Sequence, residues 1–294
     1  MSALRYIKKN AMAYLFLLPF VLLFTLFVIL PVLYAIFLSL TNYNMLENPG
    51  FVGITNYKLL ILDDDEFIIA LKNTFVFSCI SGPISFFASF FMAWIINQVK
   101  CRNLFSLAFY APSITSGVAI SVVWLYFFSA DRYGLVNNFL YNLGLISEPI
   151  KWNLDASTIL PVIIFISIWM GMGTGFLTFL AGFQTVDKEM YEAAAIDGIK
   201  NRFQELFYIT FPQMKPQLLF GAINAIVGSF GVFDIAVSFA GMPSPNYAAH
   251  TLVAHLYDYA FTRFEMGYAS AIAVILFAIT FLLGRLVTRI FASD

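Results

Sequence analysis

Six apolar segments, each long enough to cross a lipid bilayer, constrain the fold of this chain more than any other feature. A helix needs about 20 apolar residues to span about 30 Å of hydrocarbon. The chain is 61% hydrophobic, whereas soluble chains are about 45–50% apolar. The sequence therefore predicts an all-α, polytopic membrane helical bundle that forms a single domain, 1–294. The predicted spans lie near residues 13–38, 68–97, 104–128, 158–182, 216–240 and 266–290.

The basic residues predict how these spans are oriented. With the N-terminus inside, eleven of the 16 Lys and Arg residues fall on the cytoplasmic side, and the other five fall outside. An excess of basic residues marks cytoplasmic loops, so both termini are expected in the cytoplasm. The first segment is too long for a signal-peptide core and is expected to be a retained span. The formal net charge of −1 argues against a nucleic-acid partner.

The predicted loop between the fourth and fifth spans, residues 187–215, is unusually polar. It holds nine of the chain's 33 charged residues in 29 positions. Asp187 suits a helix N-cap, and the alanines at 193–195 favour a helix. Gly198 suits the left-handed residue that ends a helix, and Asn201 can cap a second one. These residues predict a helix–turn–helix hairpin at the membrane surface, which either docks on another protein or merely reconnects two spans.

Two motifs in this loop resemble a known family. "EAAAIDG" followed by "ITFP" resembles the EAA loop of binding-protein-dependent ABC importer permeases, although Phe211 stands where the family pattern has Leu. Other segments resemble the carbohydrate subclass, the maltose and glycerol-phosphate class, on the side of its first permease subunit. They are "LFLLPFVLLFTLFVILPVLYAIFLSLTNYN", "FVGITNYKLL", "ALKNTFVF" and "FEMGYASAIAVILF". The resemblance implies the type I ABC importer permease fold.

The resemblance also implies partners and a role for the loop. The loop would be a coupling helix that docks on a cytoplasmic ABC ATPase dimer, and that dimer would carry ATP and Mg²⁺. A second related permease, an extracytoplasmic solute-binding protein and a carbohydrate substrate would complete an importer in a bacterial-type inner membrane. This chain has no P-loop and would be neither an enzyme nor the holder of a cofactor. The implied ATPase-coupling residues are Glu192, Ala193, Ala194, Asp197 and Gly198.

Small and polar residues along the fifth predicted span suggest a substrate path. They are Gly221, Asn224, Gly228, Gly231 and Asp234. Their spacing of three or four residues keeps them near one helical face, where they either pack helices closely or line a wet path. The resemblance favours the second interpretation, because related permeases place sugar contacts in this span. Trp169 in the fourth span is a further candidate, because its ring could stack on a sugar. The candidate path residues are Asn224, Gly228, Ser229, Asp234 and Trp169.

Two other functions remain open at this stage. A secondary transporter or channel without an ATPase usually shows paired repeats or intramembrane coupling charges, and neither is evident. An intramembrane enzyme would need a catalytic constellation within the spans, and none is found. His250 and His255 are five residues apart with no carboxylate at a helpful offset, so they are expected to be ordinary interfacial histidines without a metal.

Overall fold

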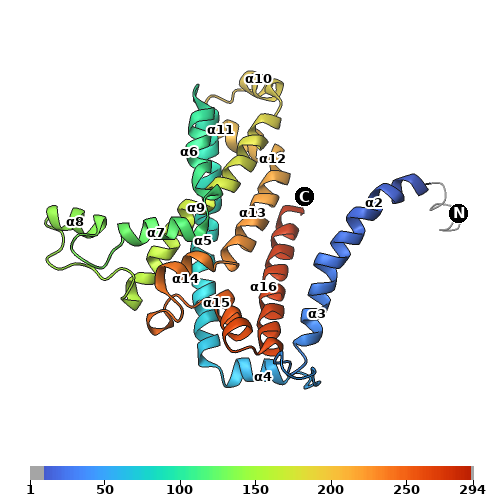
Figure 1. The fold of residues 1–294 in the computed structure, drawn as a ribbon. Coiled ribbons are helices and arrows are strands. Elements are labelled where there is room, and N and C mark those ends of the chain that lie inside the picture. The colour runs from blue at the N-terminus through green and yellow to red at the C-terminus, as the bar shows by residue number, and fades with distance from the viewer. Residues whose placement is uncertain (1–9, 293–294) are drawn as a thin grey trace. The chain divides into compact units, whose positions relative to one another are not determined.

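The computed structural model describes residues 10–292 and is helical throughout (Figure 1). The chain divides into two compact units. The first comprises Met1–Asp63 and Leu256–Ile275, and the second comprises Asp64–His255 and Leu276–Asp294. In the described part, the only β pairing is an isolated bridge between Thr41 and Phe51.

The first unit contains an apolar helix followed by a short structured loop. Asn56 fixes this loop, because its side-chain amide donates to the carbonyls of Ser39 (2.9 Å) and Thr41 (2.8 Å). The Gly267 amide donates to the Tyr43 carbonyl at 2.9 Å. A Cβ at Gly267 would collide with the Thr41 carbonyl, so only glycine permits this approach. The elements are α2 (Ala11–Phe24), η1 (Thr25–Ile29), α3 (Leu30–Leu38), α4 (Thr55–Leu62) and η4 (Asp258–Thr262).

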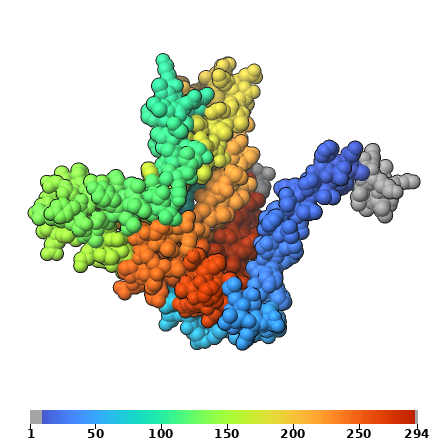
Figure 2. Space-filling model, in the orientation of Figure 1, coloured from blue at the N-terminus to red at the C-terminus, as the bar shows by residue number. Residues whose placement is uncertain are grey.

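The second unit is built on three long helices, α5 (Asp65–Asn97), α9 (Ala156–Thr185) and α13 (Lys215–Phe230), which pack against one another. A surface hairpin lies at one end of this unit (Figures 1 and 2). Its elements are α10 (Lys188–Ile196), α11 (Arg202–Glu205), η2 (Leu206–Thr210) and α12 (Phe211–Gln213). The other elements are α6 (Arg102–Ile114), α7 (Gly117–Phe127), α8 (Leu135–Asn142), α14 (Asp234–Ala240) and η3 (Pro245–Tyr247). Two helices, α15 (Leu252–Tyr257) and α16 (Met266–Ala292), run from one unit into the other.

Small residues bring α5 and α9 close together. A Cβ at Gly175 would lie 3.0 Å from the Ser89 hydroxyl, and one at Gly171 would lie 3.3 Å from the Ser85 hydroxyl. Ser89 also donates to the Met172 carbonyl on α9 at 3.1 Å. Small residues at a helix interface allow the backbones to approach, and a hydroxyl can then reach the neighbouring helix. The pairing of α5 with α9 therefore follows from their Gly and Ser content.

Five of the six predicted spans are confirmed as helices long and apolar enough to cross a membrane. They are Ala11–Leu38, Asp65–Asn97, Ala156–Thr185, Lys215–Ala240 and Met266–Phe291. The basic residues Arg5, Lys8 and Lys9, which helped to predict the orientation of the first span, lie outside the described residues.

The span predicted near 104–128 is helical but sharply bent. The helices α6 and α7 meet there at a bend of 98°, so together they form either a broken span or a re-entrant loop. Thr115 and Ser116 between them have extended backbone, with ψ of 139° and 130°. Serine, threonine and glycine favour helices weakly, and Pro112 removes a helical hydrogen bond just before the bend. These local preferences outweigh the apolar character of the segment.

The helix predicted over 216–240 is also interrupted. It ends at Phe230, and α14 begins at Asp234 after a non-helical break. Phe233 in this break has φ −141° and ψ −65°, which is outside the helical region. Asp234 therefore does not continue the helical face of α13.

Candidate functional site: a hydroxyl-lined cavity

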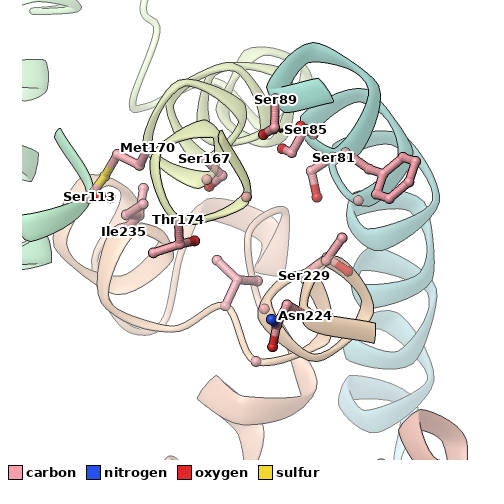
Figure 3. A pocket seen from close by; sticks show the side chains of 18 of the residues that line it. Ser81, Ser85, Ser89, Ser113, Ser167, Met170, Thr174, Asn224, Ser229 and Ile235 are labelled. Atoms are coloured by element: carbon pink, nitrogen blue, oxygen red, sulfur yellow. Dashed lines mark hydrogen bonds between the residues drawn. The ribbon is translucent and has the colours of Figure 1, made fainter. Parts of the chain in front are cut away.

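A cavity of about 450 Å³ lies within the second unit, between α5, α9, α13 and α14 and beside the bend from α6 to α7. Figure 3 shows its side chains pointing inward from these helices. Most of the residues that line the cavity are small, hydroxylated or aromatic. Those with a polar side chain are Ser81, Ser85, Ser89, Ser113, Thr115, Ser167, Thr174, Asn224, Ser229 and Asp234. The cavity wall thus combines polar side chains with apolar ones.

Several of these hydroxyls are bound to the helix that carries them. Ser89 donates to the Ser85 carbonyl at 2.6 Å, Ser113 to Tyr110 at 2.8 Å and Ser229 to Ile226 at 3.0 Å. Donation to a carbonyl three or four residues earlier is the usual way in which a helix satisfies a buried Ser or Thr. These hydroxyls still keep lone pairs that can accept a hydrogen bond from a ligand.

Two hydroxyls in the cavity wall have no partner. The Oγ atoms of Ser81 and Ser167 are buried and make no hydrogen bond. A buried polar group without a partner costs about 1–3 kcal/mol, and such groups are uncommon in folded proteins. Ser81, which is only 3% exposed, points into the cavity from α5 (Figure 3).

Four of the five path candidates from the sequence line this cavity. Asn224 and Gly228 lie on the exposed side of α13, Ser229 is buried beside them, and Asp234 opens α14. Among the described residues, Asp234 is the only charged one in the lining. The start of α7 lies against it, because a Cβ at Gly117 would be 3.3 Å from a carboxylate oxygen of Asp234. The bend in the chain thus places Asp234 at the cavity although α13 has ended. Contact of these four residues with a substrate stays a prediction.

The sequence left open whether the small residues of α13 pack helices closely or line a path, and its glycines do both. A Cβ at Gly221 would lie 2.5 Å from the Phe179 ring, so this glycine permits close packing of α13 on α9. A Cβ at Gly228 would meet nothing within 4 Å, so this glycine borders open space. Small residues on this helix therefore serve both packing and lining.

Trp169 lies apart from the other four candidates. It borders a separate cavity of about 190 Å³ together with Phe109 and Pro112. Its ring packs edge-on against Trp124 with 5.3 Å between the centroids. A role for Trp169 in the path stays a prediction, and the structure does not bring this residue together with Asn224.

The predicted hairpin is present with the predicted caps. The Asp187 carboxylate accepts from the Glu189 amide at 3.2 Å, and the Asn201 side chain accepts from the Gln204 amide at 2.8 Å. Gly198 has φ +96°, a conformation that L side chains rarely adopt. The glycine thus allows the turn between α10 and α11.

The coupling candidates on this hairpin do not all face the same way. Glu192, Ala193, Asp197 and Gly198 are exposed, whereas Ala194 is 8% exposed and packs in the core of its own unit. Tyr191 supports this packing, because its hydroxyl lies 2.9 Å from that of Thr210 on η2. Contact of the five candidates with an ATPase stays a prediction.

The two histidines are buried and paired, which the sequence did not predict. His250 and His255 are 3% and 0% exposed, and His250 Nε2 lies 3.0 Å from His255 Nδ1. His255 Nε2 in turn lies 3.0 Å from Asp64 Oδ2. Asp64 is 191 residues away in the sequence, so no local offset could reveal it. Within the described residues, no group of His, Cys, Asp and Glu side chains could hold a metal ion.

Sequence reasoning missed several functional candidates on α5. Asn73 holds the segment before α15 by donating to the Tyr247 carbonyl at 2.8 Å and the His250 carbonyl at 3.0 Å. The cavity serines of α5 are spaced four residues apart, at Ser81, Ser85 and Ser89. This helical period on an apolar span was a signal for a polar stripe on one face. The hydrogen bonds of Asn73 join residues more than 170 positions apart, so no local pattern in the sequence indicates them.

Known proteins resemble this chain along nearly its whole length. The family model "Binding-protein-dependent transport system inner membrane component" matches residues 2–293. The arabinooligosaccharides transport system permease protein AraP of Bacillus subtilis (strain 168) is 32% identical over 92% of this chain and 85% of its own. The lactose transport system permease protein LacF of Rhizobium radiobacter is 32% identical over 93% of this chain and 90% of its own.

Solved structures share the fold. A chain from the crystal structure of a bacterial ABC transporter that imports the acidic polysaccharide alginate superposes with a TM-score of 0.82. It is 22% identical, and the match covers 100% of each chain. This likeness confirms the predicted all-α permease fold. With the family match over residues 2–293, it follows that this multi-pass membrane chain belongs to the family of inner membrane components of binding-protein-dependent transport systems.

Proposed function

We propose that this chain is a membrane-spanning subunit of an ATP-driven importer for a sugar or oligosaccharide. The observation that carries the proposal is the cavity of about 450 Å³, whose wall carries several hydroxyl side chains and an amide. Sugars are rich in hydroxyl groups, which both donate and accept hydrogen bonds as these side chains do. A path must hold its solute weakly enough to release it, and scattered hydroxyls meet that need better than fixed charges do.

The names of the relatives support a carbohydrate substrate. AraP serves arabinooligosaccharides and LacF serves lactose, and both match more than nine-tenths of this chain. Another solved neighbour, 21% identical, is an alginate transporter in complex with a periplasmic protein that holds an alginate pentasaccharide. By analogy, a solute-binding protein would deliver the solute to this chain from outside the cytoplasm.

The remaining partners follow from the same proposal. A second related permease would complete the path, and a cytoplasmic ATPase dimer would bind ATP and Mg²⁺. The exposed residues Glu192, Ala193 and Asp197 give the hairpin a surface on which an ATPase could act. The chain would lie in the inner membrane of a bacterial-type cell, with both termini in the cytoplasm.

The test compares uptake by the native chain and by hairpin variants, each reconstituted in vesicles with its copurified partners. Gly198→Asp and Glu192→Lys are expected to abolish uptake and the coupled ATP hydrolysis while the chain still inserts. Glu148→Lys, which also reverses an exposed charge but lies far from the hairpin in the sequence, serves as the control and should transport normally.

The same assay separates the proposal from a secondary transporter or channel. An ATPase is expected to copurify with the chain, and uptake should stop when ATP or Mg²⁺ is withdrawn. Solute movement without ATP, or normal uptake by both hairpin variants, would refute the proposal.

A further inference from the structure

A second cavity lies at the hairpin end of the second unit and differs in character from the hydroxyl-lined one. Its volume is about 460 Å³. Residues from the end of α5, the start of α6, the end of α9 and the hairpin line it. We call it the basic cavity, because three basic side chains and only one carboxylate border it. They are Arg102, Lys188, Arg202 and Glu205.

The positive charge of the basic cavity is only partly compensated. Arg202 donates to Glu205 at 2.9 Å, so this pair is close to neutral. Arg102 and Lys188 make no ion pair within the described part of the chain. Arg102 is also the first residue of α6, whose positive end adds to the field there. Two uncompensated cations thus face one space from different helices.

Three of the residues that line the basic cavity are apolar and buried, and we call them its floor. Phe183, Val186 and Leu206 are 6%, 8% and 1% exposed and belong to the core of the unit. Trp94 of α5 packs on Phe203 of α11 with 5.2 Å between the ring centroids, which ties the hairpin to α5. The cavity therefore offers cations at its rim and apolar surface beneath them.

We propose that the basic cavity binds a phosphate group, carried either by an anionic phospholipid headgroup or by a free phosphate. Arg and Lys bind phosphate oxygens through charge-assisted hydrogen bonds. The side-chain amides of Asn97, Gln98 and Gln184 also border the cavity and supply further donors. The apolar floor suits the glycerol and acyl part of a lipid, which lies beneath its headgroup.

Binding there would join α6 to the hairpin. Arg102 comes from α6, whereas Lys188 opens α10, so one phosphate held by both would bridge the two. The exposed coupling candidates Glu192, Asp197 and Gly198 do not border the basic cavity. A ligand could therefore occupy it without covering those residues, and the proposal does not depend on what the transporter carries.

The experiment uses the full-length chain in lipid nanodiscs and measures its thermal unfolding midpoint. One arm compares phosphatidylcholine discs with discs that also contain phosphatidylglycerol. The other arm titrates inorganic phosphate against chloride at matched ionic strength, in phosphatidylcholine alone. The test variant is Arg102→Gln with Lys188→Gln. The matched control is Lys100→Gln with Lys200→Gln, which removes the same charge from the same end of the unit but from residues that do not border the cavity.

Phosphatidylglycerol or phosphate is expected to raise the midpoint of the native chain and of the control. The test variant should lose most of that rise, with affinity at least about tenfold weaker, because two charge-assisted contacts are removed. The variant Arg102→Lys with Lys188→Arg keeps both positive charges and should retain the rise in the unfolding midpoint. A response in the lipid arm alone identifies a headgroup, and a response in both arms identifies phosphate itself. Equal responses of test and control variants, or no response in either arm, would overturn the proposal.

Discussion

Two polar regions inside the second unit contrast sharply. Near the start of α5, Asp64, His255 and His250 form a chain of contacts at 3.0 Å. Farther along the same helix, the buried hydroxyl of Ser81 borders the cavity and has no hydrogen-bond partner. Polar groups that pair with each other stabilise a fold, whereas unpaired groups beside a cavity are free to bind a ligand. The first region should therefore matter for stability and the second for transport.

The paired region should give the largest effect on stability. Asp64 accepts from the Phe67 amide at 2.8 Å as the N-cap of α5 and also contacts His255. Asp64→Ala removes both contacts and leaves a buried histidine without its carboxylate, so the free energy of unfolding should fall by about 2–4 kcal/mol. Thermal unfolding of both chains in detergent measures this loss of stability.

A second variant sharpens the interpretation of that result. Asp64→Ser keeps a capping oxygen but is too short to reach His255, so it should recover only the capping part of the loss. Asp65→Ala, at the exposed neighbouring position, is the control and should change stability little. If Asp64→Ala is as stable as the control, the paired region is not the structural anchor that its geometry indicates.

The two glycines of α13 test the boundary between packing and open space. Gly221→Ala forces a methyl group against Phe179 and should cost about 1–3 kcal/mol through overpacking. Gly228→Ala places the same methyl group in open space and should leave the unfolding midpoint unchanged or slightly raised, because alanine favours a helix. Equal losses for the two variants would contradict the position assigned to the cavity.

The open region should respond in transport and not in stability. Asn224→Leu removes an exposed amide from the cavity wall, so transport efficiency should fall about tenfold, as expected for a lost hydrogen bond of about 1.4 kcal/mol. The unfolding midpoint should move little, because exposed side chains contribute little to stability. Uptake in vesicles and thermal unfolding are measured on the same preparation, and an unchanged uptake would remove Asn224 from the path.

The smallest effect is expected at the unpartnered serine. Ser81→Ala removes a buried hydroxyl that has no hydrogen bond, so the chain should be as stable as the native one or slightly more stable. Apparent affinity for the transported solute should weaken a few-fold. Ser89→Ala is the matched comparison, because it loses hydrogen bonds to Ser85 and Met172 and should destabilise the chain by about 1 kcal/mol.

Much of the candidate site was visible in the sequence because helices repeat at short range. Gly221, Asn224 and Gly228 share a helix at spacings of three and four residues, so the sequence was enough to suggest a common face. The hairpin was predictable for the same reason, since Asp187, Gly198 and Asn201 act on backbone atoms within a few residues of themselves. Local chemistry of this kind is fixed by the order of residues.

The sequence by itself therefore determined that the chain is a helical membrane protein with a capped polar hairpin, because hydropathy and capping are local properties. Only the tertiary structure decided which polar groups meet. The 98° bend after Ile114 placed the start of α7 against Asp234, and packing brought Asp64 to His255 across 191 residues. Such contacts depend on how helices cross, and no short window of residues carries that information.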